Sequence, residues 1–400
     1  MFTCSLVCWT KPPAKNNGSP GCLLSEMAED KRYWVGLTLV KGIGAVRLRA
    51  LLEYFGSAEA AWNGSLFDLV GAGLSPKLAE RLQQARKSVD LGEILAQAEK
   101  NQIKILSWDD PEYPPPLKEI DQPPPVLYLR GTLSAEDHWA VAIVGTRAVT
   151  SYGRQVTEEL ASLLAHNGVT VVSGLARGVD AIAHQAALKA GGRTLAVLGS
   201  GVDKIYPPEH RGLAEKIYER GAVLSDYAPG TPPENANFPP RNRIISGLSM
   251  AIVVIEAGET SGALITAEFA VDQSREVFAV PGPIYAPQSK GTNRLLASGA
   301  KVLLKPADVL EALDLTRNVE RREVRQAVAT DATEAALLET LNAEPLHIDD
   351  IRARLELPVE KISAALTMLE LKGLVRQVGG MNYVTIREAA ANYQAGAAQG

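Results

Sequence analysis

The feature of this sequence that most limits its fold is a series of short, nearly uninterrupted hydrophobic runs. The runs are Val141–Val144, Thr170–Ser173, Thr194–Leu198, Ala222–Leu224, Ala251–Ile255, Val277–Val280 and Lys301–Leu304. Strands that are buried on both faces of a parallel sheet have this composition. Candidate helices lie between the runs, at residues 152–167, 180–190 and 263–274. Strand, helix and strand in repetition predict an α/β fold with a doubly wound, mainly parallel sheet.

The segment before this region is predicted to be helical. Residues 33–40 and 45–55 have helical patterns, and Lys41-Gly42-Ile43-Gly44 joins them. This arrangement is similar to a helix-hairpin-helix motif, whose backbone amides can contact a phosphate. A packing turn with a glycine at the helix end explains the same residues. Two further helices are predicted at residues 75–86 and 91–101. A proline-rich passage, residues 113–131, then favours an extended approach strand or connector.

The last part of the chain has the pattern of a winged helix. Helical stretches at residues 333–341, 348–355 and 359–373 precede a hairpin, residues 374–386, that turns at Gly379-Gly380. At 400 residues the chain suits several domains. The predicted parts are a disordered extension (1–29), a small helical domain (30–102), a Rossmann-like domain (103–315), a linker (316–332), a winged-helix-like domain (333–388) and a disordered tail (389–400).

Composition narrows the possible functions. All three cysteines, Cys4, Cys8 and Cys22, lie in the first 22 residues, so they predict neither a disulfide framework nor a metal site. The absence of cysteine from the rest fits a reducing compartment. No window approaches the roughly 18 apolar residues of a membrane span. We therefore expect a cytoplasmic protein that is not embedded in a membrane.

The net charge of −5 hides local differences that matter for a polyanion partner. Lys and Arg outnumber Asp and Glu by three in residues 31–100 and by two in residues 141–250. In residues 331–400 the acids exceed the bases by four. Because a phosphate track needs only a local basic surface, nucleic acid is expected on the front and middle of the chain.

Glycine-bearing loops follow five of the predicted strands. They are residues 145–147, 174–180, 199–204, 257–263 and 281–283. The carboxyl ends of the strands share one edge of such a sheet, and ligands bind there. Glycine lets backbone amides approach an oxyanion, and helix N-termini favour one. The predicted counter-charges are Arg147, Arg177, Lys204, Arg241 and Arg243. The alternative is that the glycines only turn each strand into its helix.

Enzyme motifs are not found at this edge. The sequence contains neither Gly-x-Gly-x-x-Gly after the first strand nor a Gly-x-x-x-x-Gly-Lys-Ser/Thr loop, which argues against dinucleotide and ATP sites. Asp180 and His184 stand four residues apart on one helix, where they are either an acid/base pair or an internal helix-orienting pair. We expect a binding site with no catalytic residue, no metal and no cofactor.

Five motifs in order resemble the DprA/Smf family over nearly the whole chain. They are Val144-Gly-Thr-Arg147, the segment Ser173 to His184, Gly201-Val-Asp-Lys-Ile-Tyr-Pro207, Phe238-Pro-Pro-Arg-Asn-Arg-Ile-Ile-Ser-Gly247 and Glu256-Ala-Gly-Glu-Thr-Ser-Gly-Ala-Leu264. The resemblance implies a sterile-alpha-motif-like helical domain, an extended Rossmann core and a winged-helix-like domain. It also implies binding and protection of single-stranded DNA, loading of the recombinase RecA in natural transformation, and a homodimer joined through the Rossmann domain.

The resemblance also implies roles for individual residues. Arg147, Lys204, Arg241 and Arg243 would hold phosphates, and Tyr206 would stack on a base, as aromatic side chains do in single-strand sites. Tyr206 could instead be a core aromatic, and Arg241 to Arg243 could brace the sheet edge. The residues expected at the DNA are Gly145, Thr146, Arg147, Ser173, Gly174, Arg177, Gly178, Lys204, Tyr206, Arg241, Asn242, Arg243, Ser261 and Gly262.

Two other functions are alternatives to binding of single-stranded DNA. The same kind of core resembles lonely-guy-type nucleoside-monophosphate phosphohydrolases, in which case Glu256 and Arg177 are the catalytic candidates, although the Pro-Gly-Gly-x-Gly-Thr signature is not found. A scaffold for recombination partners would need no DNA contact and would leave the basic loops unexplained. In the winged-helix-like domain, Ile362, Leu366 and Leu369 are expected to pack inward. The residues left outward are Glu360, Lys361, Ser363, Thr367 and Glu370. With the acidic excess of this region, they predict a protein-contacting or dimer-supporting module and not a reader of the DNA major groove.

Overall fold

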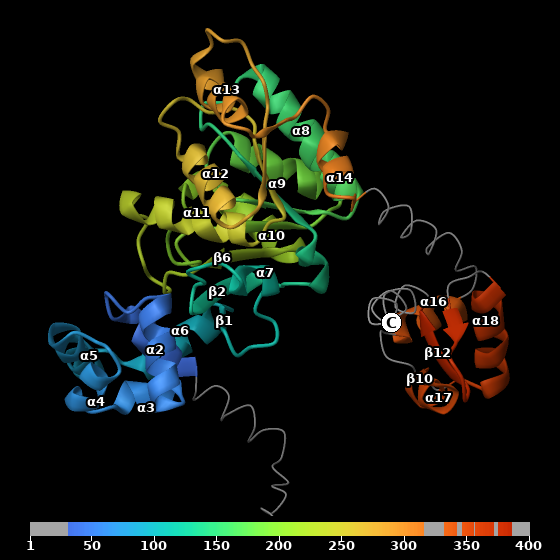
Figure 1. Ribbon diagram of the computed structural model, residues 1–400, viewed down its shortest axis with the longest axis horizontal. Coiled ribbons are helices and arrows are strands. Elements are labelled where there is room, and N and C mark those ends of the chain that lie inside the picture. The colour runs from blue at the N-terminus through green and yellow to red at the C-terminus, as the bar shows by residue number, and fades with distance from the viewer. Residues whose placement is uncertain (1–30, 316–331, 342–345, 356, 372–374, 386–400) are drawn as a thin grey trace, which may run out of the picture. The chain divides into compact units, whose positions relative to one another are not determined.

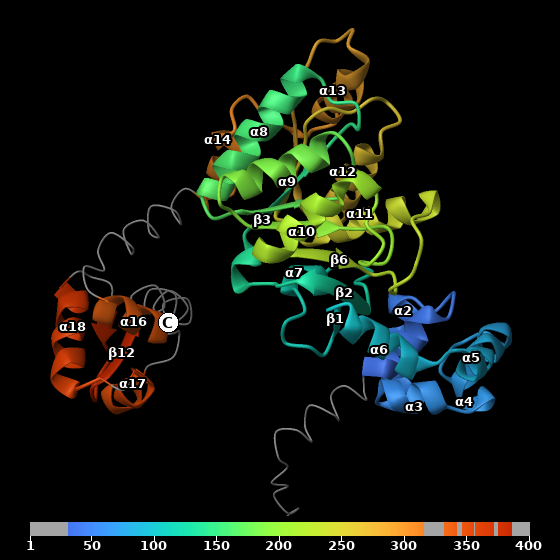
Figure 2. The same ribbon diagram turned by 180° about the vertical axis from the view of Figure 1, so that it is seen from behind.

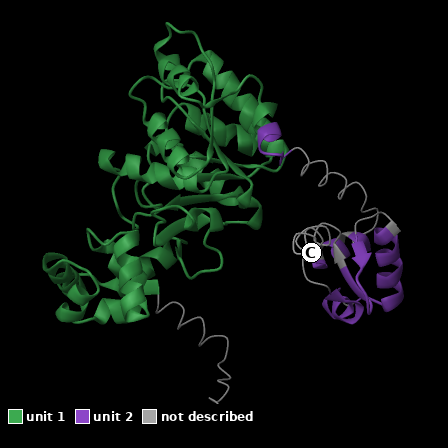
Figure 3. Ribbon diagram, viewed as in Figure 1, with its two compact units in different colours: residues 1–309 green, residues 310–400 purple. Residues whose placement is uncertain are grey.

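The computed structural model describes residues 31–315, 332–341, 346–355, 357–371 and 375–385. The chain forms two compact units, Met1–Val309 and Leu310–Gly400 (Figure 3). The helical and Rossmann-like domains therefore belong to one unit. The predicted extension, tail and nearly all of the predicted linker lie outside the described residues.

A nine-stranded sheet is the centre of the first unit (Figure 1). Its order is β1-β2-β6-β5-β4-β3-β7-β8-β9, and the strands from β6 to β9 are parallel. All seven predicted runs form strands, which confirms the α/β class. The bounds are β1 Lys104–Ser107, β2 Val126–Gly131, β3 Ala140–Val144, β4 Thr170–Ser173, β5 Thr194–Val197, β6 Ala222–Ser225, β7 Ala251–Val254, β8 Glu276–Ala279 and β9 Lys301–Val302.

The proline-rich passage leads into an antiparallel extension of this sheet. Strand β2 pairs with β6, with Tyr128 opposite Ser225, and β1 pairs with β2. The sequence analysis did not predict β1. Its four residues have no distinctive pattern and are held by pairing with β2.

The connections reverse direction at β3. This strand pairs with β4 on one side and with β7 on the other, so Val141 lies beside both Val171 and Ala251. Such a switch point opens a crevice at the carboxyl ends of the two neighbouring strands. The loops that follow β3 and β7 therefore flank the expected ligand edge.

Helices cover both faces of the sheet, as a doubly wound fold requires. Helices α8, α9 and α10 pack together on one face, and α11 and α12 pack together on the other (Figures 1 and 2). The bounds are α7 Pro115–Lys118, η1 Ala135–His138, α8 Ser151–His166, α9 Val179–Lys189, η2 Pro208–His210, α10 Arg211–Arg220, η3 Asn235–Asn237, α11 Phe238–Gly247, α12 Gly262–Asp272, η4 Pro287–Ser289, α13 Lys290–Ala297 and α14 Ala307–Ala312.

The helical domain is a small bundle that continues into the same core. It contains a helix at residues 31–39 and then α2 Ala45–Phe55, α3 Ala58–Asn63, α4 Leu66–Gly71, α5 Pro76–Ser88 and α6 Leu91–Lys100. The four predicted helices are confirmed, and α3 and α4 are additional. Trp34 packs edge-on against Trp108 with ring centroids 5.8 Å apart, and Lys31 Nζ lies 2.8 Å from Asp110 Oδ1. These contacts attach the bundle to the β1 end of the sheet.

The second unit contains the winged-helix domain. Its elements are α16 Ala332–Thr340, β10 Leu346–His347, α17 Ile348–Leu355, α18 Val359–Leu371, β11 Val375–Gln377 and β12 Asn382–Thr385. The strands form the sheet β10-β12-β11. Ile362, Leu366 and Leu369 are buried in its core, which confirms the expected inward face of α18. Strand β10 was not predicted.

No helix in the part of the chain that the structure describes is long and apolar enough to cross a membrane.

Candidate nucleic-acid interface

Two of the protein's own carboxylates occupy positions at the glycine-loop edge, the region formed by the loops after β3, β4, β5 and β7. The first is Glu256, which follows β7 and is 4% exposed. Its Oε2 accepts a hydrogen bond from the Thr150 amide at 2.9 Å, and its Oε1 accepts one from the Thr150 hydroxyl. Thr150 is the N-cap of α8, so Glu256 is a buried anion at a helix N-terminus. Both of its oxygens serve this cap.

The second carboxylate is Asp180, in the first turn of α9, directly after the loop that follows β4. Asp180 Oδ2 accepts hydrogen bonds from the amides of Gly174, at 3.1 Å, and Ala176, at 3.3 Å. Burial raises the pKa of this carboxyl, and the nearby Arg241 guanidinium opposes the shift. The Gly174 amide, which was expected near a phosphate, is therefore already bonded within the protein.

His184 has a different partner from Asp180. Its Nδ1 lies 2.6 Å from the Thr194 hydroxyl, and the side chain is fully buried. Burial lowers its pKa to about 3, so the imidazole is neutral at pH 7. Asp180 and His184 thus have separate internal contacts, and of the two only Asp180 bonds to backbone amides at the N-terminal end of α9.

Arg241 on α11 lies beneath the loop after β4. It is 5% exposed, and its Nη1 donates a hydrogen bond to the Val197 carbonyl. A Cβ on Gly174 would collide with its guanidinium, so glycine is required there for the two to pack. Burial lowers its pKa to about 10, against the opposing charges of Asp180 and Asp226. The Arg241 charge is therefore directed into the protein.

Arg243, two residues further along α11, also has an internal partner. Its Nη2 lies 2.7 Å from Asp226 Oδ2, and both side chains are mostly buried. Asp226 follows β6, and burial raises the pKa of its carboxyl while Arg243 opposes the shift. This ion pair ties α11 to the loop after β6, so Arg243 has the geometry of the bracing alternative.

Two predicted residues, Arg147 and Tyr206, instead reach the surface beside one aromatic ring, that of Phe238. The Arg147 guanidinium carbon lies 5.9 Å from the Phe238 ring centroid, and the Tyr206 ring lies 5.8 Å from it. Arg147 and Tyr206 are exposed. Lys204 precedes Tyr206 by two residues, and its half-exposed Nζ lies 4.0 Å from Asp203 Oδ2. The loops after β3 and β5 thus present two exposed cations and Tyr206, and Phe238 at the start of α11 lies beside Arg147 and Tyr206.

The remaining predicted residues shape the loops around this surface. Exposed Arg177 pairs with Glu209 at 2.5 Å. Gly178 has φ +76°, and a Cβ there would collide with the Thr146 carbonyl, so glycine lets the loops after β3 and β4 touch. Ser261 caps α12, and Asn242 Nδ2 donates to the Gly262 carbonyl at 3.2 Å. The Ser173 hydroxyl donates to the Ile143 carbonyl at 2.6 Å, and Gly145 packs against Val179.

Sequence reasoning quoted Phe238 only as part of a motif and assigned it no role. The available signal was its position: an aromatic residue directly before Pro239-Pro240 and three residues before Arg241 begins a helix next to the predicted ligand edge. Among the described residues, no group of three or more His, Cys, Asp or Glu side chains could hold a metal ion.

Comparisons with known proteins match both units. The sequence pattern of the family described as DNA recombination-mediator protein A matches residues 104–314, and that of the DprA winged helix domain matches residues 321–381. Protein Smf of Synechocystis is 37% identical over 391 residues, which cover 88% of this chain and 98% of that protein. DNA processing protein DprA of Bacillus subtilis is 41% identical over 234 residues, covering 58% and 78%.

A solved structure agrees with the observed fold. The X-ray structure of DNA processing protein A from Streptococcus pneumoniae superposes with a TM-score of 0.62 at 36% identity. The superposition covers 70% of this chain and 97% of that one.

Proposed function

This chain belongs to the DNA recombination-mediator protein A family, and we propose that it binds single-stranded DNA at the glycine-loop edge. The observation that carries the proposal is the surface around Phe238, where Arg147 and Tyr206 arrive from different loops. Exposed cations attract phosphates, and aromatic rings accept any base by stacking. A surface with both features suits a flexible single strand whose bases are free.

The residues divide into contacting and positioning groups. Arg147 and Lys204 contact phosphates, and Tyr206 stacks on a base with Phe238 beside it. Arg241 and Arg243 hold α11 against the strand ends through the Val197 carbonyl and Asp226. Because Asp180 and Glu256 already accept hydrogen bonds from residues 174, 176 and 150, external phosphate is bound by side chains more than by those amides.

The family description supports two further assignments. A recombination mediator places a recombinase on the bound strand, so we propose RecA as the protein partner and natural transformation or homologous recombination, in the cytoplasm, as the setting. A homodimer through the Rossmann domain is supported by the edge strand β9 and the residues just after it, since Val302 is 45% exposed and Leu304, two residues beyond the strand, is 77% exposed. Leu304→Glu should convert a dimer into a monomer in light scattering, and an unchanged mass would exclude this edge.

The nucleotide-hydrolase alternative is less well supported by the geometry. Glu256, its candidate acid, has both carboxylate oxygens bonded to Thr150, and Arg177 is paired with Glu209. Incubation of the purified protein with nucleoside monophosphates tests it directly. Release of free base would favour the enzyme over the binding protein.

The decisive experiment is an anisotropy titration of oligo-dT over a salt series. Arg147→Glu/Lys204→Glu should abolish binding because each lost phosphate contact also removes counterion release. The matched control is Lys189→Glu/Lys216→Glu, which also reverses two positive charges, but at exposed positions on α9 and α10. Equal binding by the test variant and the control would move the site away from the glycine-loop edge. No binding by the wild type would reject the proposed function.

A further inference from the structure

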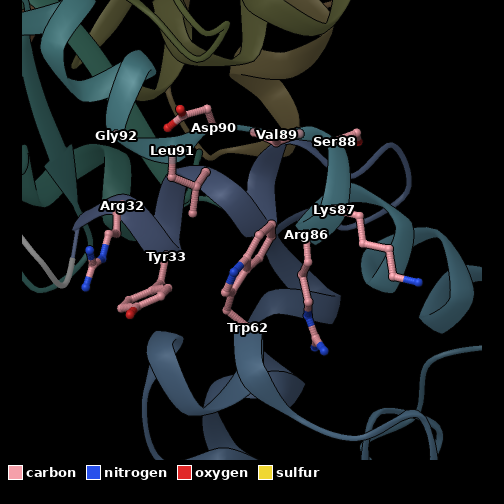
Figure 4. Close-up of a pocket in the computed structure, with 10 residues that line it drawn as sticks. All are labelled: Arg32, Tyr33, Trp62, Arg86, Lys87, Ser88, Val89, Asp90, Leu91 and Gly92. Carbon is pink, nitrogen blue, oxygen red and sulfur yellow. The ribbon is translucent and has the colours of Figure 1, made fainter.

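The helical domain contains a cavity that the glycine-loop edge does not include. Its volume is about 520 Å³, and it lies between the helix at residues 31–39, α3 and the junction of α5 with α6 (Figure 4). The lining residues are Arg32, Tyr33, Trp62, Arg86, Lys87, Ser88, Val89, Asp90, Leu91 and Gly92. All of them belong to residues 31–100, the segment with an excess of three positive charges.

The cavity is lined by three cations and one acid. Arg32, Arg86 and Lys87 carry the positive charges, and in Figure 4 Tyr33 and Trp62 lie between Arg32 on one side and Arg86 and Lys87 on the other. The acid, Asp90, is the N-cap of α6, and its Oδ1 accepts the Glu93 amide at 3.0 Å. Asp90 is therefore used by its own helix, and the lining keeps a positive excess.

Arg86 is the residue that points to a ligand. Its Nε and Nη2 are buried and have no hydrogen-bond partner in the described structure. Burial lowers the pKa of this guanidinium, and no acid offsets the shift. Nε and Nη2 form the side of the guanidinium that binds two oxygens of a phosphate or carboxylate at once. Burying such donors unpaired is costly, and an anion in the cavity would supply the missing acceptors.

The lining favours recognition of a phosphate over recognition of a base. Trp62 is only 6% exposed, and its ring packs against Gly36, so it offers little face for stacking. The Tyr33 hydroxyl is already bonded to Glu59 Oε1 at 2.9 Å. Lys87 and Ser88 also line an adjoining hollow of about 350 Å³, whose other lining residues are Glu80, Gln83 and Gln84. The lining of the first cavity thus offers cations but little ring surface, which suits a phosphodiester better than a base.

We propose that this cavity is a second phosphate-binding site, which holds a phosphodiester of the same DNA strand through Arg86 and Lys87. The inference rests on the proposed function, because the strand is the one bound at the glycine-loop edge. The cavity then extends the footprint of the strand into the helical domain. A short oligonucleotide fills only the glycine-loop edge, whereas a longer one reaches both sites.

The test uses Arg86→Gln/Lys87→Gln in the full chain, with a length series of oligo-dT. The matched control is Lys77→Gln/Arg81→Gln, which removes two exposed charges from the same helix but does not touch the cavity. We expect about tenfold weaker binding of long oligo-dT by the test variant, and unchanged binding of the shortest length that binds. The salt slope for the long strand should fall by about 0.7 for each lost contact.

Several results would overturn the inference. Equal binding by the test variant and the control at every length removes the second site. An equal loss at short and long lengths means that the substitution acts on the glycine-loop edge. A calorimetric signal for dTMP or inorganic phosphate that the test variant loses, with long-strand binding intact, assigns the cavity to a free phosphate. The first of these outcomes leaves the proposed function standing, whereas wild-type protein that binds no length rejects the proposed function itself.

A second variant covers the case in which the glutamine substitutions disturb folding. Arg86→Lys keeps the charge and removes the two-pronged donor edge. It should weaken long-strand binding while the thermal transition stays that of the wild type, and unchanged binding of the long strand would contradict the role given to Nε and Nη2.

Discussion

Arg241→Met separates the two roles that a basic residue at this edge can have. In the wild type the Arg241 guanidinium is buried, donates to the Val197 carbonyl and lies within the field of the Asp180 and Asp226 carboxylates. Methionine fills similar space but leaves Asp180 without that compensating cation. Arg241 forms no direct ion pair with either carboxylate, but removing the cation that offsets a buried charge has a cost that approaches that of breaking a buried ion pair, about 3–5 kcal/mol.

The expected cost lies near the lower end of that range. Burial already raises the pKa of Asp180, so its carboxyl takes up a proton more readily once the cation is gone. The lost hydrogen bond to Val197 adds about 1 kcal/mol. We therefore expect the free energy of unfolding to fall by about 3–4 kcal/mol in urea titrations at pH 7.

DNA binding, unlike stability, should not change in this variant. Under conditions where both proteins are folded, Arg241→Met should keep the wild-type salt slope for oligo-dT, because Arg241 contacts no phosphate. Arg147→Met is the matched control. It should keep wild-type stability, since the side chain is exposed. The slope of the logarithm of the binding constant against the logarithm of the salt concentration should become shallower by about 0.7, the value of one phosphate contact. An Arg241→Met protein of wild-type stability with a reduced slope would refute this reasoning and make Arg241 a phosphate ligand.

Two further predictions concern the buried groups beneath the edge. Glu256→Gln keeps the shape of the side chain but removes the charge at the N-terminus of α8. It should lower the free energy of unfolding, measured in urea, by about 1 kcal/mol. If the wild type releases free base from nucleoside monophosphates and the Glu256→Gln variant does not, Glu256 has a catalytic role instead. His184 has a pKa lowered from 6.5 to about 3 by burial, so the unfolded chain takes up the proton first and stability is lost as the pH falls below 6.5. Between pH 7 and pH 5 the wild type should lose about 2 kcal/mol more than His184→Gln, and parallel losses would contradict a buried neutral imidazole.

The sequence was sufficient to predict the arrangement of elements. Continuous hydrophobic runs such as Val141–Val144 can be buried only between two helical layers, so their number and spacing predicted the parallel sheet. Three helical stretches and a hairpin that turns at two glycines predicted the winged helix. Strands β1 and β10 were missed because each is short and depends on a partner strand elsewhere in the chain.

The sequence also predicted which edge carries the basic and glycine residues, but it could not divide them by role. Arg147 and Arg241 are the same residue type near the same edge, and either could face a phosphate by its sequence alone. The packing of α11 under the loop after β4 buries Arg241 against Gly174, whereas Arg147 stays exposed beside Phe238. The sequence by itself thus determined the fold class and the location of the charged loops, because hydrophobic spacing and strand ends are local properties. Only the tertiary structure decided which guanidinium faces solvent, because burial depends on the neighbours that distant segments bring.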